Sequence, residues 1–438
     1  THPEGPNIGF GSDPSWLSKG AHGKTDLLHT GNIQGGKLLI IMVGLPGRGK
    51  TYIARKVSRY LRWISYRTRV FSLAKYRYAL DKLGSKKSAN FFDPQNKESY
   101  QQRVDLMTAA LEDVMRYLNH GGEIAILDGT NTTQDRRDII RTRAAKENGF
   151  DILWIESICD ADQCRSLDEQ SDSIDFINSA DYQKRIEYYQ QNYTPLSDNE
   201  GASIKLYNNG QKLKLHGIHG FLRTKIASFV MNLHAKPRPI FLTRHGENVF
   251  NSRGLIGGDS ELTTFGQLYA AALDDYMQYN ETGTNNSEVR GSATNLVVWC
   301  STMLCARETA QRIKNAGYVQ WRALRELEAG ICDGLTYEQI RVKFPSEYRA
   351  REQDKLRYRY PRGESYFDVA TRLEPIIFEL ERNEKPLIIV AHQAVLRCLY
   401  AYFLDIPMEE LPYLSIPLHT LIKLEPMAYG CKEKRVKI

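Results

Sequence analysis

Apolar runs alternate with longer amphipathic stretches from residue 37 onward, and this pattern predicts α/β structure. Residues 38–43 are continuously apolar and predict a buried strand, and residues 52–63 then predict an amphipathic helix. Two more apolar runs, 124–127 and 152–155, predict further buried strands. Because buried strands separated by helical stretches are typical of βαβ units, we expect a mostly parallel sheet here.

A second α/β set is predicted after a break near residues 234–239, where two prolines in three residues interrupt regular structure. Its clearest strands are expected at 240–242, 296–299 and 387–390. Between the first two of these strands, the polar stretch 279–295 predicts a surface-loop insertion.

Length and composition agree with a globular chain of more than one domain. The chain has 438 residues, of which 42% are hydrophobic and 25% charged, whereas typical domains hold roughly 100–200 residues. Residues 1–36 show little periodicity and predict a flexible leader. We therefore expect a leader at 1–36, an amino-terminal domain at 37–235 and a carboxy-terminal domain at 236–438.

Charge and apolar runs argue against nucleic-acid and membrane partners. The formal net charge is +7, but the basic residues form no dense tract beyond a short stretch at 432–437. The longest apolar run, 38–43, is far shorter than the ~20 residues that span a bilayer. Small phosphorylated ligands account for the positive charge equally well.

The seven cysteines are widely spaced, and no pair has C-x-x-C spacing. An odd number of scattered cysteines in a long chain predicts neither a disulfide framework nor a zinc site. Such a chain fits a reducing compartment, so we expect a cytoplasmic location.

A phosphate-binding loop follows the first predicted strand. It matches G-x-x-x-x-G-K-[ST], and the predicted strand and helix that flank it argue against a glycine-rich turn without a ligand. The glycines let backbone N–H groups face the phosphates of a nucleotide, the lysine supplies charge, and the threonine hydroxyl suits Mg²⁺. The residues are Gly44, Leu45, Pro46, Gly47, Arg48, Gly49, Lys50 and Thr51.

Asp128 follows the predicted strand 124–127, at the sheet edge where α/β proteins bind ligands. It suits holding Mg²⁺ through water or accepting a proton from a substrate hydroxyl. An N-cap role for a helix that starts near Thr133 is the alternative. Thr130 and Arg136 add hydroxyl and guanidinium donors that suit a second phosphorylated substrate.

Two histidines follow separate predicted strands of the second set. Arg244 and His245 come after one strand and His392 after another, so the strand ends should bring both imidazoles into one pocket. One histidine suits nucleophilic attack on a phosphoryl group, and the other suits stabilising its oxygens beside Arg244. Leaving-group protonation needs a carboxyl group, for which Glu326 and Glu328 are both candidates.

These motifs resemble the bifunctional 6-phosphofructo-2-kinase/fructose-2,6-bisphosphatase family from residue 37 to residue 431. The resemblance implies an amino-terminal P-loop kinase with a mostly parallel sheet and a carboxy-terminal histidine-phosphatase α/β domain like that of phosphoglycerate mutase. It also implies a homodimer that makes fructose 2,6-bisphosphate from ATP and fructose 6-phosphate, hydrolyses it through a phosphohistidine, and so controls glycolysis. The specific stretches are 43–56, 130–133, 155–159, 244–259, 358–366, 391–402 and 411–420.

The family's residue roles carry over onto matching positions. In the kinase, Gly44–Thr51 would bind ATP with Mg²⁺ at Thr51 and Asp128, Asp128 would be the acidic active-site residue, and Cys159 would lie nearby. In the phosphatase, His245 would be phosphorylated and Glu326 would be the acid/base. Fructose 6-phosphate would be held by Arg77, Arg103, Thr130, Arg136, Arg185 and Tyr189. The 2-phosphate would be held by Arg244, Asn251, Gly257 and His392, and the sugar with its 6-phosphate by Tyr337, Arg351, Lys355, Tyr366, Gln393 and Arg397.

Two departures from the family pattern change the expectations. The segment 160–182 is shorter and more acidic than usual, and it lacks the expected Asn and Lys near the ATP phosphates. Histidine phosphatases usually carry an arginine where this chain has Cys305, and Arg307 should turn roughly 200° away on a helix. A weakened kinase, a protein with only phosphatase activity and a phosphate-sensing scaffold are therefore alternatives to two working halves.

Overall fold

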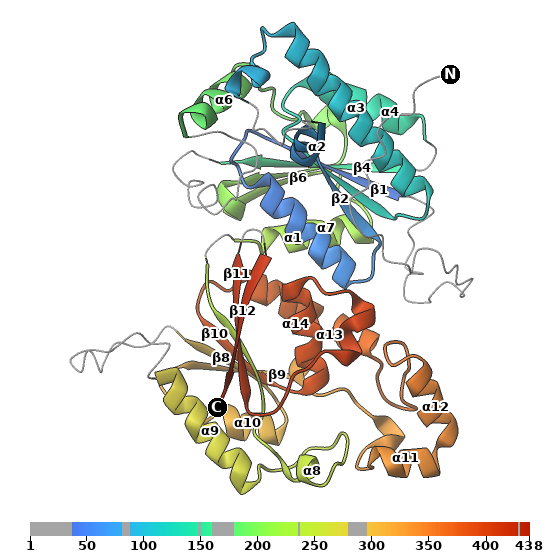
Figure 1. The fold of residues 1–438 in the computed structure, drawn as a ribbon, viewed down its shortest axis with the longest axis vertical. Coiled ribbons are helices and arrows are strands. Elements are labelled where there is room, and N and C mark those ends of the chain that lie inside the picture. Colours follow the sequence, from blue (N-terminus) through green and yellow to red (C-terminus); the bar gives the residue numbers. More distant parts are fainter. Residues whose placement is uncertain are drawn as a thin grey trace, which may run out of the picture. The chain divides into compact units, whose positions relative to one another are not determined.

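The computed structural model describes residues 37–80, 88–147, 150–159, 179–234, 237–278, 296–427 and 430–438 (Figure 1). The described residues form two compact units, one running up to Ala54 and from Arg67 to Met231, the other Arg55–Tyr66 together with Asn232–Ile438. The leader at 1–36, the insertion at 279–295 and most of the segment 160–182 lie outside the described residues. No helix in the described part of the chain has the length and apolar character needed to cross a bilayer.

The first unit is built on a six-stranded sheet in the order β2-β3-β1-β4-β5-β6. The first five strands of that order pair in parallel, and only β6 is antiparallel to its neighbour. This confirms the mostly parallel sheet predicted from the alternating runs. The strands are β1 Lys37–Val43, β2 Thr68–Ser72, β3 Ile124–Asp128, β4 Phe150–Ile158, β5 Ser203–Tyr207 and β6 Lys212–His216.

Helices cover this sheet because its strands are apolar on both faces. Leu39, Ile41 and Val43 of β1 belong to one buried cluster with residues of α3 and α4, while α7 lies on the other face in Figure 1. The 3₁₀ turns of this unit are η3 Ala89–Phe92, η4 Asp198–Glu200 and η5 Asn208–Gly210. The helices are α1 Lys50–Trp63, whose residues from Arg55 onward belong to the second unit, α2 Leu73–Leu80, α3 Lys97–Asn119, α4 Gln134–Ala145, α6 Ser179–Gln191 and α7 Phe221–Met231.

The second unit is built on another six-stranded sheet, in the order β12-β11-β7-β10-β8-β9. Strands β7, β10, β8 and β9 pair in parallel, whereas β11 runs antiparallel to β7 and to β12. The predicted strands after the proline-rich break are thus confirmed. They are β7 Ile240–Arg244, β8 Val297–Ser301, β9 Gly317–Trp321, β10 Leu387–Ala391, β11 Thr420–Met427 and β12 Gly430–Lys437.

Helices of the second unit lie around this sheet, and α11 and α12 pack with Ala329, Cys332 and Tyr360 in a separate small apolar cluster (Figure 1). Residues of α9 and α10 pack with β7, β8 and β10 in one buried cluster. The 3₁₀ turns are η7 Arg322–Leu324, η8 Gly330–Cys332 and η9 Met408–Tyr413. The helices are α8 Val249–Ser252, α9 Thr264–Tyr276, α10 Leu304–Ala310, α11 Tyr337–Lys343, α12 Pro345–Gln353, α13 Tyr366–Arg382 and α14 Gln393–Leu404.

Candidate active sites

The glycine-rich loop connects the end of β1 to the start of α1. Gly44, Gly47 and Gly49 all have positive φ angles, which side chains other than glycine rarely adopt. A Cβ atom on Gly44 would lie 2.5 Å from the carbonyl oxygen of Ser157, so the backbone here also needs the absence of a side chain. Because α1 begins at Lys50, the N–H groups of its first turn lie at this loop and suit phosphate oxygens.

A hydroxyl and a carboxylate lie together beside the loop. Thr51 Oγ1 donates a hydrogen bond to Asp128 Oδ2 at 2.9 Å, and Asp128 is the last residue of β3. Both side chains offer oxygen atoms, which are the ligands that Mg²⁺ prefers in proteins. Lys50 is buried and donates to the Leu45 carbonyl within the loop. The predicted nucleotide residues therefore lie together around one loop.

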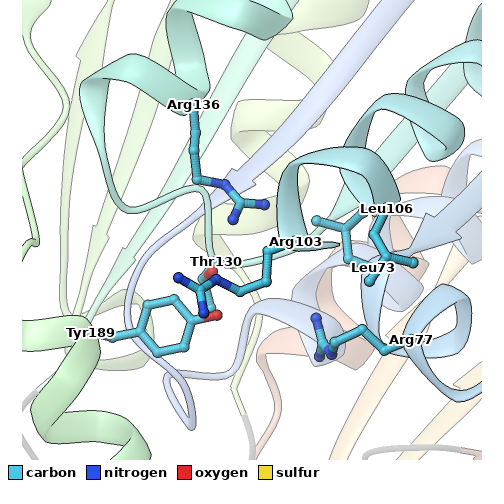
Figure 2. A pocket seen from close by; sticks show the side chains of 7 residues that line it. All are labelled: Leu73, Arg77, Arg103, Leu106, Thr130, Arg136 and Tyr189. Atoms are coloured by element: carbon cyan, nitrogen blue, oxygen red, sulfur yellow. The ribbon is translucent and has the colours of Figure 1, made fainter. Parts of the chain in front are cut away.

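Three arginines from three helices converge on a small pocket in the same unit. Figure 2 shows Arg77 of α2, Arg103 of α3 and Arg136 of α4 with their guanidinium groups turned toward a common space. The hydroxyls of Thr130 and Tyr189 lie at the same space. Five residues predicted to hold a sugar phosphate thus line one pocket. Sequence reasoning missed the apolar members Leu73 and Leu106, which carry no chemical signature.

Arg185, the sixth predicted sugar-phosphate residue, lies against the aromatic wall of this cluster. Its guanidinium carbon is 3.9 Å from the centre of the Phe92 ring and 6.0 Å from that of Tyr189. Burial acts to raise the pKa of Tyr189, but the charges of Arg185, Arg77 and Arg136 outweigh it and hold that pKa below its usual value. Burial also lowers the pKa of Arg136. The pocket is strongly electropositive and is suited to a phosphate dianion.

Cys159, which the family resemblance places near the kinase site, forms a disulfide bond. It lies directly after β4 and is buried. One bonded cysteine is not a disulfide framework, so the expectation that the chain has none stays a prediction, but Cys159 offers no free thiol to a reaction. Cysteine spacing alone could not reveal a single bond of this kind. Among the residues that the structure describes, the free cysteines are Cys300, Cys305, Cys332, Cys398 and Cys431.

The second unit contains a cavity of about 400 Å³ at the carboxyl ends of β7 and β10. All of the residues predicted for hydrolysis line it. Glu328, the alternative acid, does not line it and is exposed, so the geometry favours Glu326. The predicted residues in its wall are Arg244, His245, Asn251, Gly257, Glu326, Tyr337, Arg351, Lys355, Tyr366, His392, Gln393 and Arg397.

The two histidines face each other at the buried end of this cavity. Their ring centres are 4.9 Å apart, and both residues are almost fully buried. His245 Nδ1 lies 2.7 Å from the Gly246 carbonyl oxygen, so this nitrogen donates and Nε2 keeps its lone pair. Burial, and then the charge of Arg244, lower the pKa of His245 to about 4. The imidazole is therefore neutral near pH 7 and able to act as a nucleophile.

His392 and Glu326 complete the chemical groups of this site. Burial, with His245 and Arg244, holds the pKa of His392 well below its usual value. Burial raises the pKa of Glu326, although the N–H groups of Leu327 and Ala394 donate to its carboxylate at 2.9 and 3.1 Å. A carboxyl group with a raised pKa suits a general acid.

The wider part of the cavity presents cations held by tyrosines. Arg351 donates to the hydroxyls of Tyr360 at 2.8 Å and Tyr337 at 3.0 Å, and Arg397 donates to the Tyr366 hydroxyl at 2.8 Å. These bonds fix the guanidinium groups at the wall before a ligand arrives. Such fixed forks suit a phosphate dianion.

Cys305 lies in the first turn of α10 beside the histidine pair. It is 1% exposed and packs in a buried cluster with Leu262 and Ala270. Arg307 is absent from the cavity wall, as expected from its position on the helix. Asn248 and Leu418 also line the cavity, and sequence reasoning missed both. Asn248 precedes α8, and its side chain caps that helix, so the sequence pattern around it indicates a helix start and not a binding residue.

Comparison with known proteins assigns both halves. Residues 26–237 match the family model for 6-phosphofructo-2-kinase, and residues 240–438 match that for branch 1 of the histidine phosphatase superfamily. The 6-phosphofructo-2-kinase/fructose-2,6-bisphosphatase of Caenorhabditis elegans is 44% identical over 94% of this chain and 90% of its own length. The human 6-phosphofructo-2-kinase/fructose-2,6-bisphosphatase 3 is 45% identical over 91% of this chain and 76% of its own length. The human 6-phosphofructo-2-kinase/fructose-2,6-bisphosphatase 1 is 44% identical over 91% of this chain and 84% of its own length. The chain therefore belongs to the 6-phosphofructo-2-kinase/fructose-2,6-bisphosphatase family.

Proposed function

We propose that the first unit makes fructose 2,6-bisphosphate from ATP and fructose 6-phosphate, and that the second unit hydrolyses the 2-phosphate through a phosphorylated His245. The observation that carries the proposal is the convergence of His245, His392 and Glu326 in a cavity whose wider wall holds Arg351 and Arg397. His245 as nucleophile, Glu326 as acid and the two arginines as cations for a second phosphate are then present in one cavity.

In the kinase reaction the loop holds the triphosphate through the backbone and Lys50. Thr51 and Asp128, which are hydrogen-bonded to each other, both offer oxygen atoms that would hold Mg²⁺, and the ion would supply positive charge to the nucleotide phosphates. The arginine pocket would bind the 6-phosphate of the sugar. Phosphoryl transfer depends on this positioning more than on covalent chemistry.

In the phosphatase reaction the His245 Nε2 lone pair attacks the 2-phosphate, and Glu326 protonates the departing sugar oxygen. The sugar hydroxyl leaves, and water then attacks the phosphohistidine with Glu326 accepting its proton. Arg244 and His392 stabilise the phosphoryl oxygens, while Asn251 and Gly257 complete the wall around them. Gly257 has a φ of +65°, and a Cβ there would collide with the Asp333 carboxylate.

Assay of one preparation in both directions tests the proposal. We expect ATP and fructose 6-phosphate to yield fructose 2,6-bisphosphate, and we expect bisphosphate labelled at the 2-phosphate to leave its label on the protein. Labelling without synthesis would support the phosphatase alone. If neither reaction occurs while both ligands bind, the chain is a phosphate-binding scaffold and the proposal is wrong.

The hydrolysis rate should show a bell-shaped pH dependence. The acid limb should fall near pH 4, because protonated His245 has no lone pair to attack with. The alkaline limb should lie above the usual glutamate range, because burial raises the pKa of Glu326 and the acid is lost once its proton dissociates. Glu326→Gln should lower kcat and remove the alkaline limb in the same measurement. An unchanged alkaline limb in that variant would assign the acid elsewhere.

Cys305→Arg should raise the hydrolysis rate. A guanidinium group in this first turn of α10 would add a cation beside the phosphoryl oxygens, and one such donor is worth about 3 kcal/mol, or roughly 10²-fold in kcat. Cys305→Lys is the control, because it adds the same positive charge without the planar guanidinium group that can donate two hydrogen bonds to one phosphate. No gain from the arginine would show that Arg244 and His392 already supply the needed stabilisation.

Location and assembly stay proposals. The five free cysteines among the described residues support the proposal of a reducing compartment such as the cytoplasm. A homodimer is expected from family membership, and sedimentation of the full chain would measure it.

A further inference from the structure

The histidine pair and Cys305 form a cluster of metal-ligating atoms. The imidazole nitrogens of His245 and His392 and the sulfur of Cys305 all lie within 4.8 Å of one another, and all three residues are buried. They come from the end of β7, the end of β10 and the first turn of α10, so three separate elements converge here.

A buried imidazole nitrogen is available within the described part of the chain, whereas the Cys305 thiol is hydrogen-bonded to the Asn248 side chain, and a metal ion would have to displace both this partner and the thiol proton. His392 Nε2 is buried and has no hydrogen-bond partner there, although the residue is only 2% exposed. His245 is anchored through Nδ1 to the Gly246 carbonyl, which leaves Nε2 as its nitrogen for a ligand. A metal-binding histidine is usually held in this way, with its other ring nitrogen bonded to a carbonyl or carboxylate.

The donor set suits Zn²⁺ better than the hard cations. Two imidazole nitrogens and one sulfur are typical zinc ligands, whereas Mg²⁺ and Ca²⁺ require oxygen. Bond lengths of roughly 2.0–2.3 Å in a tetrahedral site place ligand atoms about 3.3–3.6 Å apart, so the three side chains must draw together by about 1 Å. The adjoining cavity of about 400 Å³ leaves a fourth position open to water or a ligand.

We propose that His245, Cys305 and His392 form a Zn²⁺ site, and that a bound ion occupies the imidazole nitrogen needed for phosphoryl transfer and so inhibits hydrolysis. The cysteine creates this possibility, because an arginine at the same position would bring a positive charge into the cluster. Arg244 at the cavity wall still opposes a cation, so we expect weaker binding than at a closed structural zinc site. The metal-binding part does not depend on the proposed enzymatic function.

Titration with Co²⁺ as a spectroscopic substitute for Zn²⁺ tests the site. The full chain, in a buffer without chelators or thiols, should develop a sulfur-to-Co²⁺ charge-transfer band in the near ultraviolet at one equivalent, and Zn²⁺ should abolish it. Cys305→Ser should lose the band, whereas Cys431→Ser, which removes a free cysteine outside the cluster, should keep it. Absence of the band, or its persistence in Cys305→Ser, would overturn the proposal.

Folding and inhibition are checked on the same proteins. Cys305→Ser should keep the circular dichroism spectrum of the parent, which would show that it folds. The Co²⁺ band should also be lost in His392→Asn, and loss in both variants could not be explained by misfolding of one of them. Zn²⁺ should slow hydrolysis by the parent in proportion to the fraction of sites filled, and this sensitivity should be absent in Cys305→Ser. Metal binding without inhibition would retain the site and reject its regulatory effect. Failure of the parent to hydrolyse the bisphosphate at all would count against the proposed function, while the Co²⁺ band would still decide the metal site.

Discussion

His245→Ala is expected to abolish hydrolysis of fructose 2,6-bisphosphate while leaving its synthesis intact. The side chain supplies the only atom to which we assign the phosphoryl group, and loss of a covalent nucleophile lowers kcat by at least ~10³-fold. The vacated position lies in the second unit, at the end of β7, whereas the nucleotide loop and the arginine pocket belong to the first unit. Label from the 2-phosphate should therefore no longer remain on the protein, and the rate of synthesis from ATP should match the parent.

His219→Ala is the matched control for this experiment. His219 is an exposed histidine outside the cavity, so its loss tests the effect of removing an imidazole as such. Both activities should be unchanged in it. If His245→Ala still retained the label, another residue would be the nucleophile, and the proposed phosphatase mechanism would fail.

Lys50→Ala should have the opposite effect, with loss of synthesis and unchanged hydrolysis. Lys50 is the first residue of α1, is buried, and is held by the Leu45 carbonyl inside the loop, so its charge lies at the position where the triphosphate binds. Removing a preorganised charge from a phosphoryl-transfer site lowers kcat by about 10²–10³-fold. Steady-state synthesis of the bisphosphate and calorimetric binding of ATP would measure the two consequences separately.

Lys97→Ala provides the control for the loss of a lysine charge in the same unit. Lys97 is exposed at the start of α3 and lies outside the arginine pocket. It should leave synthesis unaffected. Ordinary synthesis by Lys50→Ala would mean that the backbone N–H groups of the loop and Arg48 suffice to hold the triphosphate.

The sequence predicted most of the architecture because its strands are short, apolar and separated by helices. The helix predicted at 52–63 is α1, which begins two residues earlier, and each predicted strand is present with ends shifted by a few residues. Such shifts arise because hydrogen bonding continues beyond the apolar residues that mark a strand. The domain limits at 37–235 and 236–438 stay a prediction.

The candidate sites were predictable where motif and strand end coincide, as at Lys50, Asp128 and His245. Other groups could not be predicted from the pattern. Apolar pocket residues resemble any core residue, and the disulfide at Cys159 leaves no mark in the spacing of the cysteines. The expectation of no zinc site rested on the number and spacing of the cysteines and stays a prediction, because such spacing carries no information on the approach of His245, Cys305 and His392 in the fold.

The crowding of Arg77, Arg103 and Arg136 has a consequence for the stability of the first unit. Like charges in one partly buried pocket repel one another, so the fold that holds them together is destabilised by its own binding site. A phosphate dianion between the guanidinium groups replaces that repulsion with attraction, and a ligand that binds only the folded state raises the melting temperature. If the pocket binds the sugar phosphate as proposed, changes in the concentration of this substrate should alter the stability of the folded first unit as well as the rate of synthesis.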